Sequence, residues 1–254
     1  MLNTSTKMYA VFGDPVSHSR SPLMLNRAFR ASNIDAAYAA FHVRPNQLEQ
    51  AIQGVRALDF GGVNITIPHK VQVMQYLDEI DEGARIIGAV NTLVNDGGRW
   101  IGYNTDGIGY VRSLIEETGF SIEGKSLLVI GAGGAARGIV YALSQKNPAK
   151  IWIANRTSSK ADALAQAMRP YAETEGIALD QVSAIMDLDF MVNTTNVGMH
   201  PNVEDTPLDA ALFREGMVVS DIVYTPRKTK FLHEAEGRGC QIHGGLGMFI
   251  YQGA

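Results

Sequence analysis

Four polar clusters in the first 106 residues carry side chains that could bind a small molecule and move protons. They comprise residues 17–22, 64–70, 89–92 and 103–106, and each interrupts the chain where an apolar run ends or begins. Ligands of open α/β sheets bind outside the carboxyl ends of the strands. Together the clusters supply an ammonium group, a carboxylate, hydroxyls and amides to such an edge, so we predict a site for a small polar substrate.

Taken singly, each cluster has an ordinary structural explanation. Ser19 or Ser21 could cap a helix, and Asn91 could belong to a turn. Lys70 could be a solvated helix residue, and Asp106 could cap the helix that follows it. The combination of these groups at one edge is therefore the informative signal.

A glycine-rich turn in the second half of the chain predicts dinucleotide binding. It fits the G-x-G-x-x-G/A pattern between an apolar run and a helical pattern, and it consists of Gly131, Ala132, Gly133, Gly134, Ala135 and Ala136. The first glycine permits the sharp turn, the second lets the backbone approach a pyrophosphate, and the last alanine allows close helix packing. The N-terminus of the helix then offers N–H groups to the phosphates.

The end of the next strand indicates NADP rather than NAD. An NAD site usually places an acidic residue there against the ribose 2'-hydroxyl, whereas this chain has Asn155, Arg156 and Thr157, with Lys160 one turn on. Arg156 can bind a 2'-phosphate through two donors, and Lys160 can act as a point charge. Both cations could instead be solvated surface residues, but their place at the positive end of a helix favours an anionic partner.

With these motifs the chain resembles the shikimate dehydrogenase family. The matching segments are residues 13–22, 64–70, 88–92, 104–107, 131–135, 155–157, 193–199 and 244–248. They follow one another in order along nearly the whole chain. The resemblance implies an oxidoreductase that interconverts shikimate and 3-dehydroshikimate with NADP, in chorismate and aromatic amino-acid biosynthesis.

The resemblance also implies roles for individual residues. Lys70 and Asp106 would form the catalytic pair, with Lys70 as the general acid/base that serves hydride transfer to nicotinamide. The substrate would be held by Ser19, Ser21, Thr66, Asn91, Tyr224 and Gln252. The nicotinamide end of the cofactor would lie near Ile222, Gly245, Met248 and Glu82, although Glu82 could equally be a plain surface residue.

Two features depart from the family pattern. Residues 247–254 begin an apolar helical pattern that stops after about two turns, which is short for a globular helix. The family's C-terminal helix, which packs on the substrate domain, is thus expected to be cut short just after Gln252. Asn196 stands where the family often has proline, a change that loosens a turn but touches no catalytic group.

Hydrophobic periodicity predicts an α/β fold in two domains. Short apolar runs alternate with helical patterns, as in βαβ units with a mainly parallel sheet. Residues 89–103 indicate two strands around a tight turn, a hairpin that would close the first sheet. We expect a substrate-binding and catalytic α/β domain at 1–105, with 244–254 returning to it, and a doubly wound, Rossmann-like NADP-binding domain at 106–243.

Composition excludes several classes of function. The net charge of -4 gives no attraction for nucleic acid or anionic membranes, and no apolar run reaches the roughly 18 residues of a membrane span. Cys240 is the single cysteine, so a cytoplasmic location without disulfides is expected. The six histidines lack paired metal-binding spacing, and we treat them as structural. We expect a small-molecule substrate, no metal, no nucleic-acid or membrane partner, and a monomer or homodimer.

Three alternative functions agree with parts of the sequence. A quinate or quinate/shikimate dehydrogenase is the nearest, but Ser19, Ser21 and Arg156 favour shikimate. A catalytically silent ligand sensor would not need both Lys70 and Asp106, although a fold alone does not imply activity. A folate-type dehydrogenase would not explain the serine cluster at 17–21.

Overall fold

The structure is a computed structural model that describes residues 2–253. The chain forms two compact units, one containing the residues up to Thr105 together with Gly253, and the other residues 106–252. Residues 244–254 were predicted to return to the first unit. Of the described residues in this stretch only Gly253 groups with it, because the last helix packs along the helix that opens the second unit.

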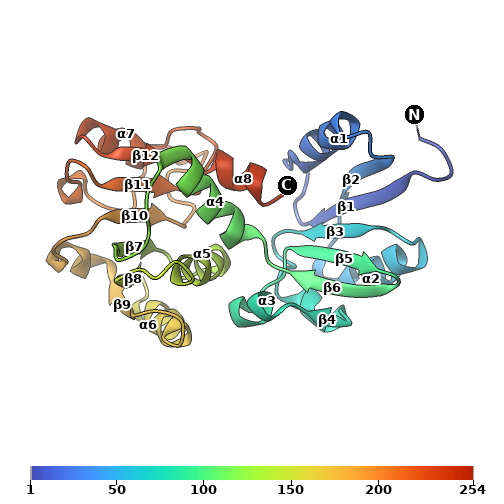
Figure 1. Cartoon of the computed structure of the whole chain (residues 1–254), viewed down its shortest axis with the longest axis horizontal. Helices are drawn as coiled ribbons and strands as arrows, with labels where there is room; N and C mark the ends of the chain where they lie inside the picture. The colour runs from blue at the N-terminus through green and yellow to red at the C-terminus, as the bar shows by residue number, and fades with distance from the viewer. Residues whose placement is uncertain (1, 254) are drawn as a thin grey trace. The chain divides into compact units, whose positions relative to one another are not determined.

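The first unit contains a six-stranded sheet in the order β2-β1-β3-β5-β6-β4 (Figure 1). Residues Ala10 and Phe12 of the first strand pack into the core cluster under helix α2, whereas Val11 packs with the helix α1 side chains on the other face. The elements are β1 (Lys7–Gly13), α1 (Ser21–Ala31), β2 (Ala36–His42), α2 (Leu48–Ala57), β3 (Gly62–Ile65), β4 (Glu79–Ile80), α3 (Glu82–Ile87), β5 (Thr92–Asp96) and β6 (Arg99–Tyr103).

The predicted hairpin is confirmed, but it does not close the sheet. Strands β5 and β6 pair antiparallel around Gly97 and Gly98, which both have positive φ. Strand β4 adds on beyond β6 and forms the edge. A strand of two residues has no hydrophobic alternation that a sequence pattern could reveal.

Strand directions bring the four polar clusters to one edge of this sheet. Strands β1 and β3 run parallel, β5 runs opposite to β3, and β6 runs opposite to β5. The ends of β1, β3 and β6 and the start of β5 therefore share an edge. The segments that follow or precede them at this edge are the clusters at 17–22, 64–70, 89–92 and 103–106.

The second unit has a six-stranded parallel sheet in the order β12-β11-β10-β7-β8-β9, the doubly wound arrangement of dinucleotide-binding folds. The two families of crossovers start from β7 and run outward in opposite directions. The elements are α4 (Asp106–Thr118), β7 (Ser126–Ile130), α5 (Gly134–Ser144), β8 (Lys150–Asn155), α6 (Ser158–Met168), β9 (Thr174–Ala178), β10 (Phe190–Asn193), β11 (Val218–Asp221), α7 (Lys230–Gly237), β12 (Gln241–His243) and α8 (Leu246–Tyr251).

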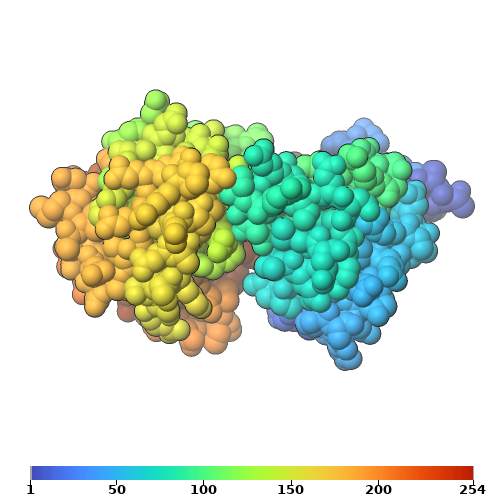
Figure 2. Space-filling view, turned by 90° about the horizontal axis from the view of Figure 1, so that it is seen from below, coloured from blue at the N-terminus to red at the C-terminus, as the bar shows by residue number. Residues whose placement is uncertain are grey.

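Strand β9 was not predicted, and a glycine explains why. Gly176 interrupts a short run that otherwise alternates, and a Cβ there would lie 2.4 Å from the backbone nitrogen of Asp162 in α6. The close contact between α6 and β9 therefore requires glycine at position 176. The same glycine interrupts the alternation of apolar and polar residues by which a strand is recognised in a sequence. Figure 2 shows the surface of this α6 and β9 region in yellow.

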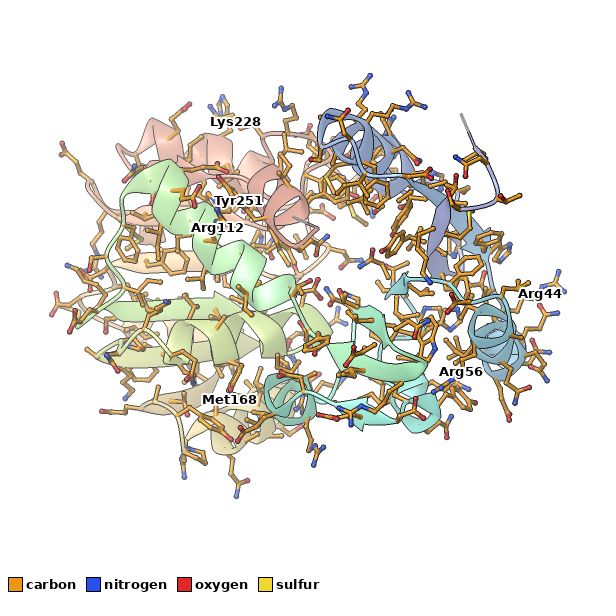
Figure 3. The ribbon with its side chains drawn as sticks, turned by 45° about the vertical axis from the view of Figure 1, so that its right-hand side comes forward. Arg44, Arg56, Arg112, Met168, Lys228 and Tyr251 are labelled. Carbon is orange, nitrogen blue, oxygen red and sulfur yellow. The ribbon has the colours of Figure 1, made fainter. Side chains whose placement is uncertain are left out.

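Helix α8 is held on α4 by polar and aromatic contacts at their exposed side. The guanidinium of Arg112 lies 5.0 Å from the centre of the Tyr251 ring, and the two side chains point toward one another in Figure 3. The Tyr251 hydroxyl donates to Glu116, which also pairs with Arg112 at 2.8 Å. Within residues 2–253 no helix is long and apolar enough to cross a membrane.

Candidate active site

Asn91 is the centre of the polar edge of the first unit. Its Oδ1 accepts hydrogen bonds from the Thr105 backbone N–H and from the Thr92 hydroxyl, both at 2.9 Å, and its Nδ2 donates to the Thr105 hydroxyl at 3.1 Å. The side chain is buried. These bonds fix the start of β5 to the end of β6. Because Thr105 directly precedes Asp106, they also fix the chain where Asp106 opens α4.

The serine cluster is joined to the same edge through Tyr38 and Asn64. The Ser21 side chain bonds to the Tyr38 phenol, and this phenol donates to Asn64 Oδ1 at 2.6 Å. Burial raises the pKa of Tyr38 well above its usual value, with the Ser21 bond opposing the effect, so the phenol stays a donor. Asn64 in turn donates to the Thr92 hydroxyl at 3.2 Å.

Neither serine caps helix α1. Arg20 occupies the cap position, no side chain caps the helix, and the Ser21 backbone N–H donates to the Ser19 hydroxyl at 3.3 Å. The capping explanation of these serines is therefore wrong. Tyr38 was missed by sequence reasoning, and the only signal for it was a hydroxyl-bearing residue within the apolar run 36–43.

Thr66 and Lys70 lie in the loop that follows β3, and both are half-buried. The Thr66 backbone N–H donates to the Phe12 carbonyl at 2.9 Å, at the end of β1. On the other side, the Lys70 carbonyl accepts from the Val90 N–H at 2.8 Å. The loop that presents Lys70 is thus bonded to two neighbouring parts of the same edge.

The glycine-rich turn of the second unit has the shape that a pyrophosphate requires. Gly131 has φ +112°, and a Cβ there would lie 2.5 Å from the Thr194 hydroxyl oxygen, so only glycine fits. Gly133 and Gly134 face open space, and no side chain caps the start of α5. First-turn N–H groups of such a helix can bind phosphate oxygens. The residues present therefore fit a dinucleotide.

The end of β8 has the charge that a 2'-phosphate requires. Arg156, Thr157 and Lys160 are exposed, and helix α6 has neither an acidic residue in its first turn nor a side-chain cap. Asn155 donates through Nδ2 to the Thr157 carbonyl at 3.0 Å, which shapes the turn between strand and helix. Two cations and the positive end of a helix dipole thus face outward together.

Asp221 organises the segment that carries the predicted nicotinamide-side residues, and sequence reasoning did not single it out. It ends β11, is fully buried, and accepts from the Val223 N–H at 2.9 Å, Asn193 Nδ2 at 3.2 Å and the Thr229 hydroxyl at 2.7 Å. Burial raises the pKa of Asp221 to about 6, against the lowering effect of these three bonds. Ile222, the next residue, donates to the Asn193 carbonyl at 3.1 Å.

The start of α8 lies against the same segment. A Cβ at Gly245 would be 2.1 Å from the Ile222 carbonyl oxygen, so this approach requires glycine. The Tyr224 ring stacks on Phe249 with ring centres 5.6 Å apart, and Met248 is buried. The predicted residues of the loop after β11 and of α8 therefore share one region of the second unit.

Gln252 lies in the second unit, although residues 244–254 were predicted to return to the first, and Glu82 lies at the surface, one of the two positions expected for it. The backbone of Gln252 lies against α4, where a Cβ at Gly109 would be 2.6 Å from the Gln252 nitrogen, so this residue belongs to the second unit. Glu82 is an exposed residue in the first turn of α3, a helix capped by the Asp81 side chain. Its predicted role near the cofactor stays a prediction. In residues 2–253 no group of three or more metal-ligating side chains comes together.

A Rossmann-like nucleotide unit joined to a smaller α/β unit with a polar sheet edge defines the class of two-domain, dinucleotide-dependent enzymes. Residues 11–93 match the family model "Shikimate dehydrogenase substrate binding domain", and residues 113–231 match "Shikimate / quinate 5-dehydrogenase". A shikimate dehydrogenase (NADP(+)) from a Geobacillus species is 53% identical over 249 residues, covering 98% of this chain and 90% of that protein.

Solved structures agree with these matches. Shikimate 5-dehydrogenase from Listeria monocytogenes, in complex with shikimate and NAD, has a TM-score of 0.95 at 36% identity and covers 100% of this chain and 91% of its own. The Thermus thermophilus enzyme, in complex with NADP(H) and shikimate, has a TM-score of 0.88 at 35% identity and covers 98% and 90%. The chain belongs to the shikimate dehydrogenase family.

Proposed function

We propose that the protein catalyses the reversible, NADP-dependent oxidation of shikimate to 3-dehydroshikimate, a step of chorismate and aromatic amino-acid biosynthesis. The observation that carries the proposal is the polar sheet edge at which hydrogen bonds join Tyr38, Asn64, Asn91 and the Lys70 loop, with Ser21 of the serine cluster against the Tyr38 phenol. Relatives named for this reaction with NADP, and a neighbour that holds both ligands, support it.

The side chains at this edge suit the proton and binding steps. Bound NADP supplies or accepts the hydride at the substrate carbon. Lys70 takes the hydroxyl proton when the alcohol is oxidised and returns it when the ketone is reduced. Asp106 orients the Lys70 amine and binds a substrate hydroxyl, while Ser19 and Ser21 donate to the substrate carboxylate.

The reaction is tested by nicotinamide absorbance with purified protein, using shikimate and quinate, each with NADP⁺ and with NAD⁺. We expect rapid reduction with shikimate and NADP⁺ only. Comparable rates with quinate would replace the proposal by a quinate/shikimate dehydrogenase. A preference for NAD⁺ would remove the argument from Arg156 and Lys160.

A lysine pair tests the catalytic assignment. Lys70→Ala is expected to lower kcat at least about 10²-fold, the usual contribution of a general acid/base, while NADP⁺ affinity stays unchanged. Lys146→Ala is the matched control, because Lys146 is exposed beyond the far end of α5, away from the glycine-rich turn. Equal rates for both variants would exclude Lys70 from the mechanism.

Location and assembly form a separate part of the proposal. The single cysteine, Cys240, is buried and unpaired, which suits a reducing cytoplasm. We propose a cytoplasmic enzyme that is a monomer or homodimer. Sedimentation equilibrium of the purified protein distinguishes these two states from larger assemblies.

A further inference from the structure

His69, which directly precedes Lys70, is buried in an unusual way. Its side chain is 0% exposed, and its Nε2 lies 2.7 Å from the Val43 carbonyl oxygen. A carbonyl oxygen can only accept, so Nε2 is the donor in this bond. Among the described residues, Nδ1 of His69 is the one buried side-chain polar atom without a hydrogen-bond partner.

The bond from Nε2 joins two segments that are far apart in the sequence. Val43 follows β2, and its N–H donates to the Gly13 carbonyl at 3.1 Å, at the end of β1. His69 belongs to the loop after β3, where its N–H donates to the Thr66 carbonyl at 3.0 Å and its carbonyl accepts from Val73 at 2.9 Å. The ring therefore connects the loop after β3 to the ends of the two neighbouring strands.

Packing alone does not account for a histidine at this position. Burying a nitrogen without a partner is unfavourable, and an apolar side chain of similar size would avoid that loss. What histidine adds is one directed N–H on a rigid ring with two side-chain torsions. The directed bond holds the backbone immediately before Lys70.

We propose that His69 is a positioning residue for Lys70. Its Nε2–H holds the Val43 carbonyl and thereby sets the position of the loop from which the Lys70 amine reaches the substrate. This inference rests on the proposed function of Lys70 as the general acid/base. It assigns no proton transfer to His69 itself.

Three substitutions separate a directed bond from simple packing. His69→Leu removes the donor and fills its place with an apolar side chain. His69→Gln can place an amide N–H near the position of Nε2. His69→Asn is polar but too short to reach the Val43 carbonyl. Ile52→Val, on helix α2 in the core cluster that also contains Val43, is the control for a mild loss of stability without a change at the loop.

The activity readout is the separation of kcat from KM. We expect kcat to fall about tenfold or more in His69→Leu and His69→Asn, to stay within about threefold of wild type in His69→Gln, and to be unchanged in Ile52→Val. The KM for NADP⁺ should not change in any of them. If His69→Leu does not fold, the Gln and Asn pair decides the question. Equal kcat values for Gln and Asn would overturn the proposal.

A second readout does not depend on catalysis. Competitive labelling of amines with limiting acetic anhydride, followed by mass spectrometry, gives the reactivity of Lys70 relative to Lys146 in the substrate-free protein. We expect this ratio to change at least about threefold in His69→Leu and to return toward wild type in His69→Gln. An unchanged ratio in all variants would overturn the positioning role, whereas a wild-type protein inactive with every substrate would overturn the proposed function instead.

Discussion

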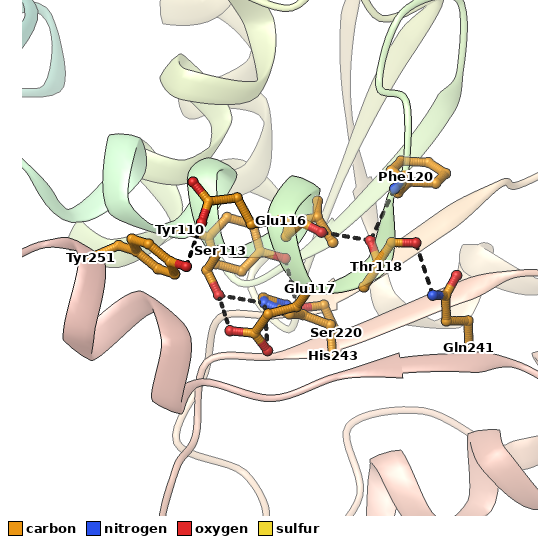
Figure 4. A network of polar contacts seen from close by, with 11 residues as sticks. Tyr110, Ser113, Glu116, Glu117, Thr118, Phe120, Ser220, Gln241, His243 and Tyr251 are labelled. Atoms are coloured by element: carbon orange, nitrogen blue, oxygen red, sulfur yellow. Dashed lines mark hydrogen bonds and ion pairs between the residues drawn. The ribbon is translucent and has the colours of Figure 1, made fainter.

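Each of the two units buries a histidine, and the two histidines differ in how many of their ring nitrogens are hydrogen-bonded. In the first unit His69 makes one ring hydrogen bond and leaves its other nitrogen unpaired. In the second unit both ring nitrogens of His243 are bonded, Nδ1 to the Ser220 hydroxyl at 2.8 Å and Nε2 to the Ser113 hydroxyl at 2.7 Å. Figure 4 shows the second arrangement.

The bonds around His243 form a chain with a single direction. At its inner end the Tyr110 phenol donates to Ser220 at 2.7 Å, and at its outer end Ser113 donates to a Glu117 carboxylate oxygen at 2.9 Å. A carboxylate only accepts, so His243 must donate from Nε2 and accept at Nδ1. Burial lowers the pKa of His243, with Glu117 opposing, and this favours the neutral ring that the chain requires.

The difference between the two regions indicates different uses of a buried polar group. A fully satisfied network stabilises and makes one packing unique, here the packing of α4 on β11 and β12. A ring with one directed bond adds little stability but fixes one segment. We therefore expect substitutions of His243 to act mainly on the free energy of unfolding, and those of His69 mainly on kcat.

The largest expected effect comes from His243→Leu. It removes two buried hydrogen bonds and leaves the Ser220 hydroxyl proton without an acceptor, so the free energy of unfolding should fall by about 3 kcal/mol. His69→Leu should lower it by only about 1 kcal/mol, because the loss of one bond, which leaves the Val43 carbonyl without its donor, is partly offset by removal of the unpaired nitrogen. Urea denaturation measures both values. Equal losses for the two variants would contradict the comparison.

Asp221, the residue after Ser220 on β11, provides a third buried polar group for comparison with the two histidines. Its hydrogen bonds are complete, but its carboxyl group can carry a charge. Its pKa is about 6 in the folded protein, against an ordinary value of 3.8. Between these values the folded state binds more protons than the unfolded state, so the stability contributed by this group falls as pH rises. The ionised carboxylate then opposes folding at neutral pH.

Asp221→Asn tests this pH dependence. Relative to the wild type, the variant should become about 1.5 kcal/mol more stable as pH rises from 5 to 8, because only the wild-type side chain ionises in this range. The lost or changed hydrogen bonds of the variant contribute equally at both pH values. Urea denaturation of wild type and variant at the two pH values gives the difference. A change that does not depend on pH would show that Asp221 is ionised throughout the range.

How well the sequence predicted these features depended on how local they are. The apolar run and the helical pattern predicted on either side of the glycine-rich turn are strand β7 and helix α5, because a local apolar period marks each of them. The nucleotide turn was equally visible, since its glycines are adjacent in the chain. Strand β4 was not, because it is too short for a pattern.

The candidate site was predictable as a set of motifs but not as a network. Tyr38 acquires its role from Asn64, 26 residues away, and no spacing rule connects the two. Asp221 likewise looked like the last residue of a strand, and its three donors come from different segments. The packing of residues 244–252 on α4 was also invisible, because Gly109 and Gly247 reveal close helix contact only once the partner is known.

The smallest expected effect belongs to Tyr110→Phe, at the inner end of the His243 chain. The variant keeps the ring and its edge contact with His243, at 5.6 Å between ring centres, and loses only the donor to Ser220. Ser220 still donates to His243, so no buried donor is left unpaired and the loss should be about 1 kcal/mol. The double variant with His243→Leu should lose less unfolding free energy than the two single variants lose together, because both substitutions act on the Ser220 hydroxyl. Strictly additive values from urea denaturation would show that the five side chains are separate contacts rather than one chain.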